Sequence, residues 1–261
     1  MRALRIAATG MEAQQTRVEV ISNNLANMNT NAYAPRRAEF ADLHYQQIRQ
    51  PGAISSVSGT VLPTGIQMGL GVRSAAVSAE FQQGALRESQ GDLDVAIEGE
   101  GFLQFTLPNG DLAFSRDGAL KRSSEGVVVN SEGYQLADQI TIPQDARSVA
   151  INSNGEVFAF FEGQPEGQQI GTITLATFTN KKGLEALGGN LFRETAASGT
   201  PLLGNAGEEG RGTLRQGFLE ESAVDVVAQI ADLIEAQRGY ELNSKVISAV
   251  DQMFGSAVQI R

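Results

Sequence analysis

Apolar residues recur at every seventh position along the C-terminal stretch 219–261, and no proline interrupts them. The members of this repeat are Val226, Leu233, Tyr240, Ile247 and Phe254. A seven-residue repeat places the side chains on one narrow face of an α-helix, which is covered by packing against another helix. Ser222 or Asp225 could cap the start of the helix. The sequence therefore predicts a rod of roughly 50 to 60 Å, at about 1.5 Å per residue, which is too long for a small domain to cover.

The same repeat occurs at the other end of the chain, in a helix expected from about Arg2 to Asn27. Its members are Leu4, Met11, Val18 and Leu25. Residues 1–37 carry five arginines and two glutamates, whereas residues 219–261 carry seven acidic and three basic side chains. Opposite charges favour pairing and fix its register, although each exposed pair adds little energy. We expect the two helices to pair as a coiled coil; the alternative is that each packs separately on a globular core.

The segment 35–75 differs in composition from both helices. It begins after an Asn-rich run that favours a turn, and it contains two proline-marked turns, at Pro51-Gly52 and Leu62-Pro63. A long excursion of this kind is usually functional or disordered. We interpret Pro51, Gly52, Leu62 and Pro63 as part of an extended connecting segment that orders against a neighbouring molecule, with plain disorder as the alternative.

Residues 76–218 show short apolar runs separated by glycine and asparagine. Leu93–Ile97 and Phe102–Phe105 read as strands, and Pro108-Asn109-Gly110-Asp111 and Asn154-Gly155 read as tight turns. The predicted fold class is α+β. It comprises paired terminal helices (1–34 and 219–261, one discontinuous domain), the connecting segment 35–75, and an antiparallel β-rich middle domain over 76–218.

Charge and composition exclude several kinds of partner. The net charge of −10 disfavours nucleic acid and anionic lipid, because both would be repelled. No stretch has the length and apolarity of a membrane span, and Arg5 interrupts the apolar run at the start of the chain, so we predict neither membrane insertion nor a cleaved secretory signal. The chain has no cysteine, which rules out disulfides and thiolate ligands.

The sequence contains only weak candidates for a reaction centre. His44 is the single histidine, and no serine stands in a nucleophile context. The acidic cluster Asp92, Asp94, Glu98 and Glu100 could hold calcium or act as acid and base, but a solvated strand face explains it better. We therefore predict no catalytic residues, no metal site and no cofactor.

Three glycines fall inside the predicted helices: Gly10, Gly239 and Gly255. Each costs about 1 kcal/mol relative to alanine in a helix interior. They indicate either tolerated local weakness or a close approach of two helices, and the sequence leaves both open.

Three stretches resemble the bacterial flagellar rod and hook proteins, and they occur in the order of that family. Residues 22–30 (SNNLANMNT) resemble the family's N-terminal signature, and residues 237–247 (QRGYELNSKVI) resemble its C-terminal signature. Residues 93–102 followed by Ser115-Arg116-Asp117-Gly118 are similar to its central β module. Residues 48–53, 62–63 and 69–73 resemble the distal rod subunits rather than the shorter proximal ones. Two residues depart from the family pattern, which commonly has glycine at Ala32 and asparagine at Ala223.

The resemblance implies a structural subunit of the distal rod that assembles into a helical tube and transmits motor torque to the hook. It further implies unfolded export through the flagellar export apparatus and a place in the periplasmic rod of the basal body. The implied partners are copies of the chain, proximal rod and hook-side axial proteins, and the surrounding ring proteins. The alternatives are another axial subunit, of the hook or proximal rod, and a β-class hydrolase that works through Asp94 and Glu98.

Overall fold

The structure is a computed structural model that describes residues 2–50, 64–163 and 166–259. By its internal contacts the chain forms two compact units. The first comprises residues 1–26, 36–79 and 225–261, and the second comprises residues 27–35 and 80–224. The expected arrangement of helical ends around an antiparallel β-rich middle is confirmed. The three-part domain division drawn from the sequence stays a prediction.

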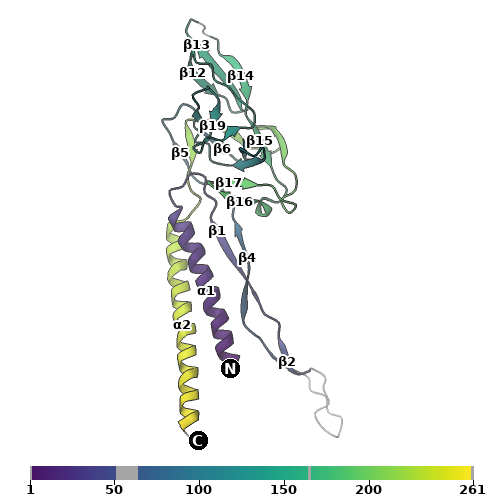
Figure 1. Cartoon of the computed structure of the whole chain (residues 1–261), viewed down its shortest axis with the longest axis vertical. Coiled ribbons are helices and arrows are strands. Elements are labelled where there is room, and N and C mark those ends of the chain that lie inside the picture. Colours follow the sequence, from purple (N-terminus) through teal and green to yellow (C-terminus); the bar gives the residue numbers. More distant parts are fainter. Residues whose placement is uncertain (1, 51–63, 164–165, 260–261) are drawn as a thin grey trace. The chain divides into compact units, whose positions relative to one another are not determined.

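The first unit combines two helices with a β-hairpin (Figure 1). Its elements are α1 (Arg2–Ala26), β1 (Arg36–Asp42), β2 (Gln46–Arg49), β3 (Ile66–Met68), β4 (Val72–Ala79) and α2 (Val226–Gln259). Strand β1 pairs antiparallel with β4, and β2 pairs antiparallel with β3. The C-terminal helix begins at Val226, because Asp225 Oδ1 accepts hydrogen bonds from the backbone N–H groups of Val227 and Ala228 at 3.0 and 3.1 Å.

The regular secondary structure of the second unit consists of short antiparallel strands and one 3-10 turn. A seven-stranded sheet has the order β16-β17-β8-β7-β11-β10-β9, a three-stranded sheet has the order β12-β13-β14, and β15-β18, β19-β6 and β20-β5 form pairs. The strands are β5 (Leu86–Glu88), β6 (Val95–Glu98), β7 (Leu103–Thr106), β8 (Leu112–Ser115), β9 (Lys121–Arg122), β10 (Val128–Val129), β11 (Gln135–Leu136), β12 (Ala146–Ile151), β13 (Glu156–Phe161), β14 (Gln168–Thr172), β15 (Thr174–Thr177), β16 (Glu185–Gly188), β17 (Leu191–Arg193), β18 (Leu202–Asn205), β19 (Thr213–Gln216) and β20 (Phe218–Glu220), with a 3-10 turn at Lys181–Gly183.

The core of the second unit has two parts. The larger is aliphatic and includes the fully buried Val95, Ile97, Leu103, Leu136 and Leu175. The smaller is a cluster of aromatic rings in edge-to-face contact, with ring centroids 4.9 to 6.3 Å apart. Its rings are Phe81, Phe102, Phe114, Phe178 and Phe192. Burial of these side chains stabilises the unit, since apolar area removed from water contributes about 25 cal/mol per Å².

A buried ion pair joins distant parts of the second unit. Arg116 Nε donates to Glu220 Oε2 at 2.9 Å, and the two side chains are 10% and 2% exposed. Arg116 Nη1 donates to the carbonyl oxygens of Gly99 and Gly101, and Glu220 Oε1 accepts from the N–H of Gly84. The backbone oxygen of Glu220 accepts from Ala32 N–H at 2.9 Å, so the residues that follow α1 are held at the same point.

Candidate assembly interface

Helices α1 and α2 pack side by side and antiparallel within the first unit (Figure 1). Contacts run in opposite chain directions: Gly10 lies opposite Asn243, Gln14 opposite Gly239, and Asn24 opposite Gln229. The sequence therefore identified the two helices that meet, and the register follows from these pairs.

The predicted repeat residues are only partly covered by this packing. Leu4, Met11, Val18 and Leu25 of α1 are half-buried, as are Val226, Leu233 and Ile247 of α2. Tyr240 and Phe254 are 45% and 47% exposed. The most buried α2 side chains are Ala236 and Val250, each three residues after a repeat residue. The role of the nine repeat residues in assembly stays a prediction.

Polar side chains make several of the contacts between α1 and α2. The apolar repeat alone does not predict these contacts. Arg17 Nη2 contacts Asp232 Oδ1 at 2.8 Å and Glu235 Oε2 at 3.0 Å. Asn24 Nδ2 donates to Gln229 Oε1 at 3.0 Å and to the carbonyl oxygen of Arg36 at 2.8 Å. Because these groups satisfy one another, they fix the register of α1 against α2 more sharply than aliphatic contacts would.

Two glycines mark the closest approach of the helices. A Cβ at Gly10 would lie 2.9 Å from Asn243 Nδ2, and a Cβ at Gly239 would lie 3.0 Å from Gln14 Cδ. Each glycine thus makes room for an amide side chain of the other helix. Gly255 has no atom within 4 Å of its Cβ position. Close approach explains the first two glycines, and nothing in the structure explains the third.

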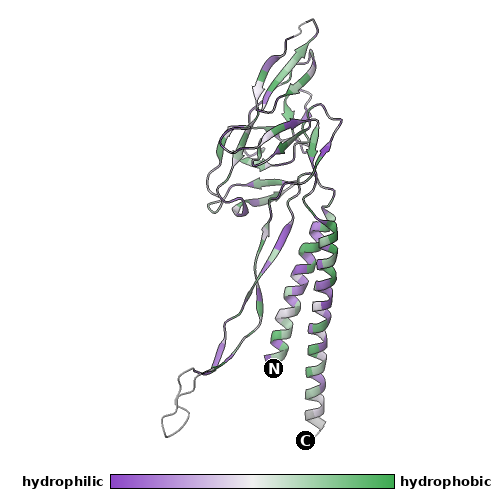
Figure 2. Cartoon of the chain, turned by 180° about the vertical axis from the view of Figure 1, so that it is seen from behind, coloured by the Kyte–Doolittle hydropathy of each residue, from purple (hydrophilic) through white to green (hydrophobic). Residues whose placement is uncertain are grey.

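Large apolar side chains on α2 face solvent in two groups. The first α2 patch is Val227, Ile230 and Ile234, and the second α2 patch is Leu242, Val246 and Met253. Figure 2 shows hydrophobic residues recurring along α2. At 100° per residue the patches point roughly 100° apart around the helix, so a single flat surface could not cover both. Exposed apolar patches of this kind are typical of binding surfaces.

A second side of α1, about 100° around the helix from the side that meets α2, packs against the hairpin. Thr9 Oγ1 accepts from Val72 N–H at 3.4 Å, and Gly71, at a φ of 118°, brings its backbone against the Thr9 side chain. Arg2 Nη1 donates to Met68 Sδ at 3.9 Å. Helix α1 is therefore held between α2 and the hairpin. Of the connecting segment, the four predicted residues Pro51, Gly52, Leu62 and Pro63 lie outside the described residues.

A shallow groove of about 400 Å³ opens along the α1–α2 pair. We call it the acidic groove, and it is lined by Gln15, Val18, Glu19, Gln237, Tyr240 and Glu241. Val18 and Tyr240 supply apolar surface and the two glutamates supply negative charge. The groove could therefore take a side chain that is part aliphatic and part cationic.

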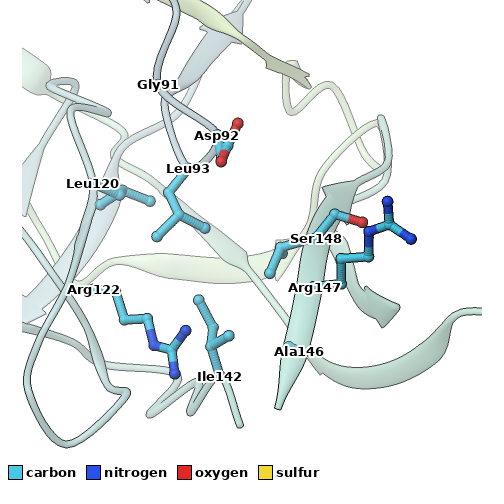
Figure 3. A pocket seen from close by; sticks show the side chains of 10 residues that line it. Gly91, Asp92, Leu93, Leu120, Arg122, Ile142, Ala146, Arg147 and Ser148 are labelled. Carbon is cyan, nitrogen blue, oxygen red and sulfur yellow. The ribbon is translucent and has the colours of Figure 1, made fainter. Parts of the chain in front are cut away.

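The second unit offers a cleft of about 290 Å³ with an aliphatic floor and two arginines beside it (Figure 3). Leu93, Leu120 and Ile142 line it, with Arg122 and Arg147 nearby. Arg122 is already bonded to the carbonyl oxygen of Pro143 at 3.1 Å. The lining of the cleft also includes Asp92 and Ser148, but it contains no histidine that could act as a base for the Ser148 hydroxyl.

The acidic residues considered as a possible calcium or acid–base site do not form such a site. Asp94 bonds the hydroxyl of Ser89, Glu98 is exposed at the end of β6, and Glu100 pairs with Lys181. Among the described residues no group of three or more potential metal ligands occurs, and His44 is exposed. Burial raises the pKa of Asp117 and of Asp138, although a backbone hydrogen bond to each opposes the change, and the charge of Asp94 also raises the pKa of Asp117.

Comparisons with known proteins match the whole chain. Residues 4–33 match the model of the flagella basal body rod protein family. Residues 96–159 match the D1 domain of the flagellar hook protein family FlgE/F/G, and residues 215–260 match the C-terminal region of the flagellar basal body rod FlgEFG proteins. No helix within the described residues combines the length and apolarity needed to cross a membrane.

Full-length relatives are also found. The flagellar basal-body rod protein FlgG of Caulobacter vibrioides is 48% identical over 100% of both chains, and that of Agrobacterium fabrum is 46% identical over 97% of both. A solved structure, the Helicobacter pylori flagellar hook protein FlgE2, covers 71% of this chain and 43% of its own at 17% identity. Its TM-score of 0.26 is too low to support a comparison of folds.

Proposed function

The chain belongs to the FlgG family of flagellar basal-body rod proteins, and on this premise we propose that its copies assemble through the exposed faces of α1 and α2. It is a structural subunit of the distal rod in the flagellar basal body and not an enzyme. The proposal concerns how the subunit performs that structural role.

One observation carries the proposal: the helices leave apolar surface uncovered after they have packed on each other. Val227, Leu242 and Met253 are 79%, 62% and 63% exposed although they belong to a helix that also has a buried side. Since apolar surface in water costs about 25 cal/mol per Å², covering these residues favours association. Patches that point in different directions bind different neighbours, and contacts of this heterologous kind produce filaments rather than closed pairs.

In the assembled rod the α1–α2 pair forms a coiled coil whose repeat residues, from Leu4 to Leu25 and from Val226 to Phe254, pack against neighbouring pairs to make a tube. The connecting segment, including Pro51, Gly52, Leu62 and Pro63, bridges adjacent subunits and stiffens the shaft that transmits torque to the hook. The subunit reaches the periplasmic rod through the flagellar export apparatus without a cleaved signal. It contacts proximal rod and hook-side axial proteins along the axis and ring proteins around it.

The alternatives are less well supported. Full-length identity of 48% to a FlgG protein favours the distal rod over the hook or the proximal rod. A hydrolase based on Asp94 and Glu98 is disfavoured, since Asp94 bonds Ser89 and Glu98 is exposed at a strand end.

Sedimentation and electron microscopy of the purified full chain would test the proposal. We expect Leu242→Asp combined with Met253→Asp to prevent filament formation, because two charges would enter a covered apolar contact. Ser124→Asp combined with Ser131→Asp is the matched control: it adds the same two charges at exposed positions of the second unit. Circular dichroism should show both variants folded. Filaments of normal length from the double variant would refute the role of the second α2 patch.

A further inference from the structure

The acidic groove carries negative charge that none of the described cationic side chains neutralises. Glu19 accepts a hydrogen bond from Gln15, and within the described residues neither Glu19 nor Glu241 contacts a cationic side chain. Tyr240, on the groove floor, is 45% exposed. The two carboxylates attract a cation through their charge, and the aromatic ring attracts it through a cation–π contact.

A surface of the opposite character lies at the start of α1. We call it the basic patch, and it consists of Arg2, Arg5, Ile6 and Met68. Ile6 and Met68 are 40% and 45% exposed, and the bond from Arg2 to Met68 holds the first turn of α1 against β3. Within the described part of the chain neither arginine has a carboxylate partner, whereas Arg17 is paired with Asp232 and Glu235. The patch therefore presents two cations beside two aliphatic side chains.

The two surfaces cannot meet within one molecule. Arg5 and Glu19 stand fourteen residues apart on one helix, which places them about 21 Å apart along its axis, and their side chains cannot span that distance. Both surfaces are complete on every copy, and neither covers the other. A contact between them must therefore join different copies. Each pair of copies joined in this way still has one free basic patch and one free acidic groove, so further copies can be added.

We propose that the basic patch of one copy docks into the acidic groove of the next. Arg5 and Arg2 approach Glu19 and Glu241, while Ile6 and Met68 cover Val18 and Tyr240. The inference rests on the proposed assembly of the subunit and names one specific contact within it. Both surfaces combine charge with apolar area, so the ion pairs become partly desolvated when the contact forms and are worth more than free surface pairs.

A charge exchange tests this contact in the full-length chain. We expect Arg5→Glu to raise the critical concentration for filament formation about tenfold or more, because it places a carboxylate against Glu19 and Glu241. The double variant Arg5→Glu/Glu241→Arg should recover most of that loss. The matched control is Arg5→Glu/Glu125→Arg, which restores net charge at an exposed position of the second unit that belongs to neither surface.

Mixing distinguishes contacts between copies from contacts within one. Arg5→Glu and Glu241→Arg chains should each assemble poorly alone and should co-assemble when mixed in equal amounts, since each then offers the surface that the other lacks. Normal assembly of Arg5→Glu, or equal rescue by Glu125→Arg and Glu241→Arg, would overturn the inference while leaving the assembly of the wild-type chain intact. Failure of the wild-type chain itself to polymerise would instead refute the proposed function.

Discussion

The buried pair of Arg116 and Glu220 makes a prediction about stability that can be worked from the structure. Replacing Glu220 by glutamine keeps the shape of the side chain and one acceptor for the N–H of Gly84, but removes the negative charge opposite Arg116. Losing one partner of a buried pair costs about 3 to 5 kcal/mol, because the other charge stays in a medium of low dielectric constant. We expect the lower end, about 3 kcal/mol, since glutamine retains part of the hydrogen bonding.

The loss should be visible in thermal unfolding of the second unit. For a unit of about 150 residues, 1 kcal/mol shifts Tm by about 2 to 4 °C, so Glu220→Gln should lower Tm by about 6 to 12 °C. Far-UV circular dichroism at the β band would report the transition, and amide hydrogen exchange of Val95–Glu98 would confirm that the strand next to Arg116 is affected.

The neighbouring residue supplies the control. Glu221 pairs with Arg87 at 3.2 Å, but the two side chains are 48% and 60% exposed. Glu221→Gln should therefore cost less than about 1 kcal/mol. The double variant Arg116→Met/Glu220→Leu should recover part of the stability, because no unpaired charge remains, but the carbonyl groups of Gly99 and Gly101 lose their donor. Equal Tm values for Glu220→Gln and Glu221→Gln would refute the reasoning.

Three further predictions concern single positions. Ala32 has a φ of 51°, where alanine is strained by about 1 kcal/mol or more, so Ala32→Gly should raise Tm; an unchanged or lower Tm would contradict the strain. Burial raises the pKa of Asp138 above its ordinary 3.8, so the native state binds this proton more tightly than the unfolded chain. The stabilising contribution of Asp138 should therefore fall as pH rises from about 3.8 through the raised pKa. In denaturant titrations over that pH window, the free energy of unfolding of Asp138→Asn should rise relative to that of the wild type; a constant difference between the two free energies would refute this. Gly255→Ala should increase helicity in circular dichroism by removing a cost of about 1 kcal/mol, whereas Gly10→Ala should gain less because it meets Asn243; equal gains would contradict the close approach at Gly10.

Local patterns in the sequence were sufficient for the elements. The seven-residue repeat predicted both terminal helices, Asp225 was one of two expected caps, and Asn109-Gly110 forms the expected turn between β7 and β8. These features depend on residues close together in the chain, where spacing and turn chemistry decide the conformation.

Features that depend on distant residues were not predictable in the same way. The pairing of Arg116 with Glu220 spans 104 positions, and neither residue carries a local sign of burial. The opposite charges of the two ends predict ion pairs between the helices, and Arg17 forms them with Asp232 and Glu235. The amide contact of Asn24 with Gln229 was not predictable, because an apolar repeat identifies a face but not the polar groups beside it. The sequence shows that Gly10 and Gly239 are costly in a helix, but the reason for them, the close approach of α1 and α2, depends on the register of the two helices.

Cysteine labelling provides the most direct measurement of whether α2 becomes covered in the filament. The chain contains no cysteine, so Leu242→Cys and Glu125→Cys each introduce one exposed thiol. In the dissociated subunit both should react with a maleimide at similar rates. After polymerisation the rate at Leu242→Cys should fall by about tenfold or more, because neighbouring subunits exclude the reagent, while Glu125→Cys reports access to the second unit. Equal reactivity at Leu242→Cys before and after polymerisation would contradict assembly through the exposed face of α2.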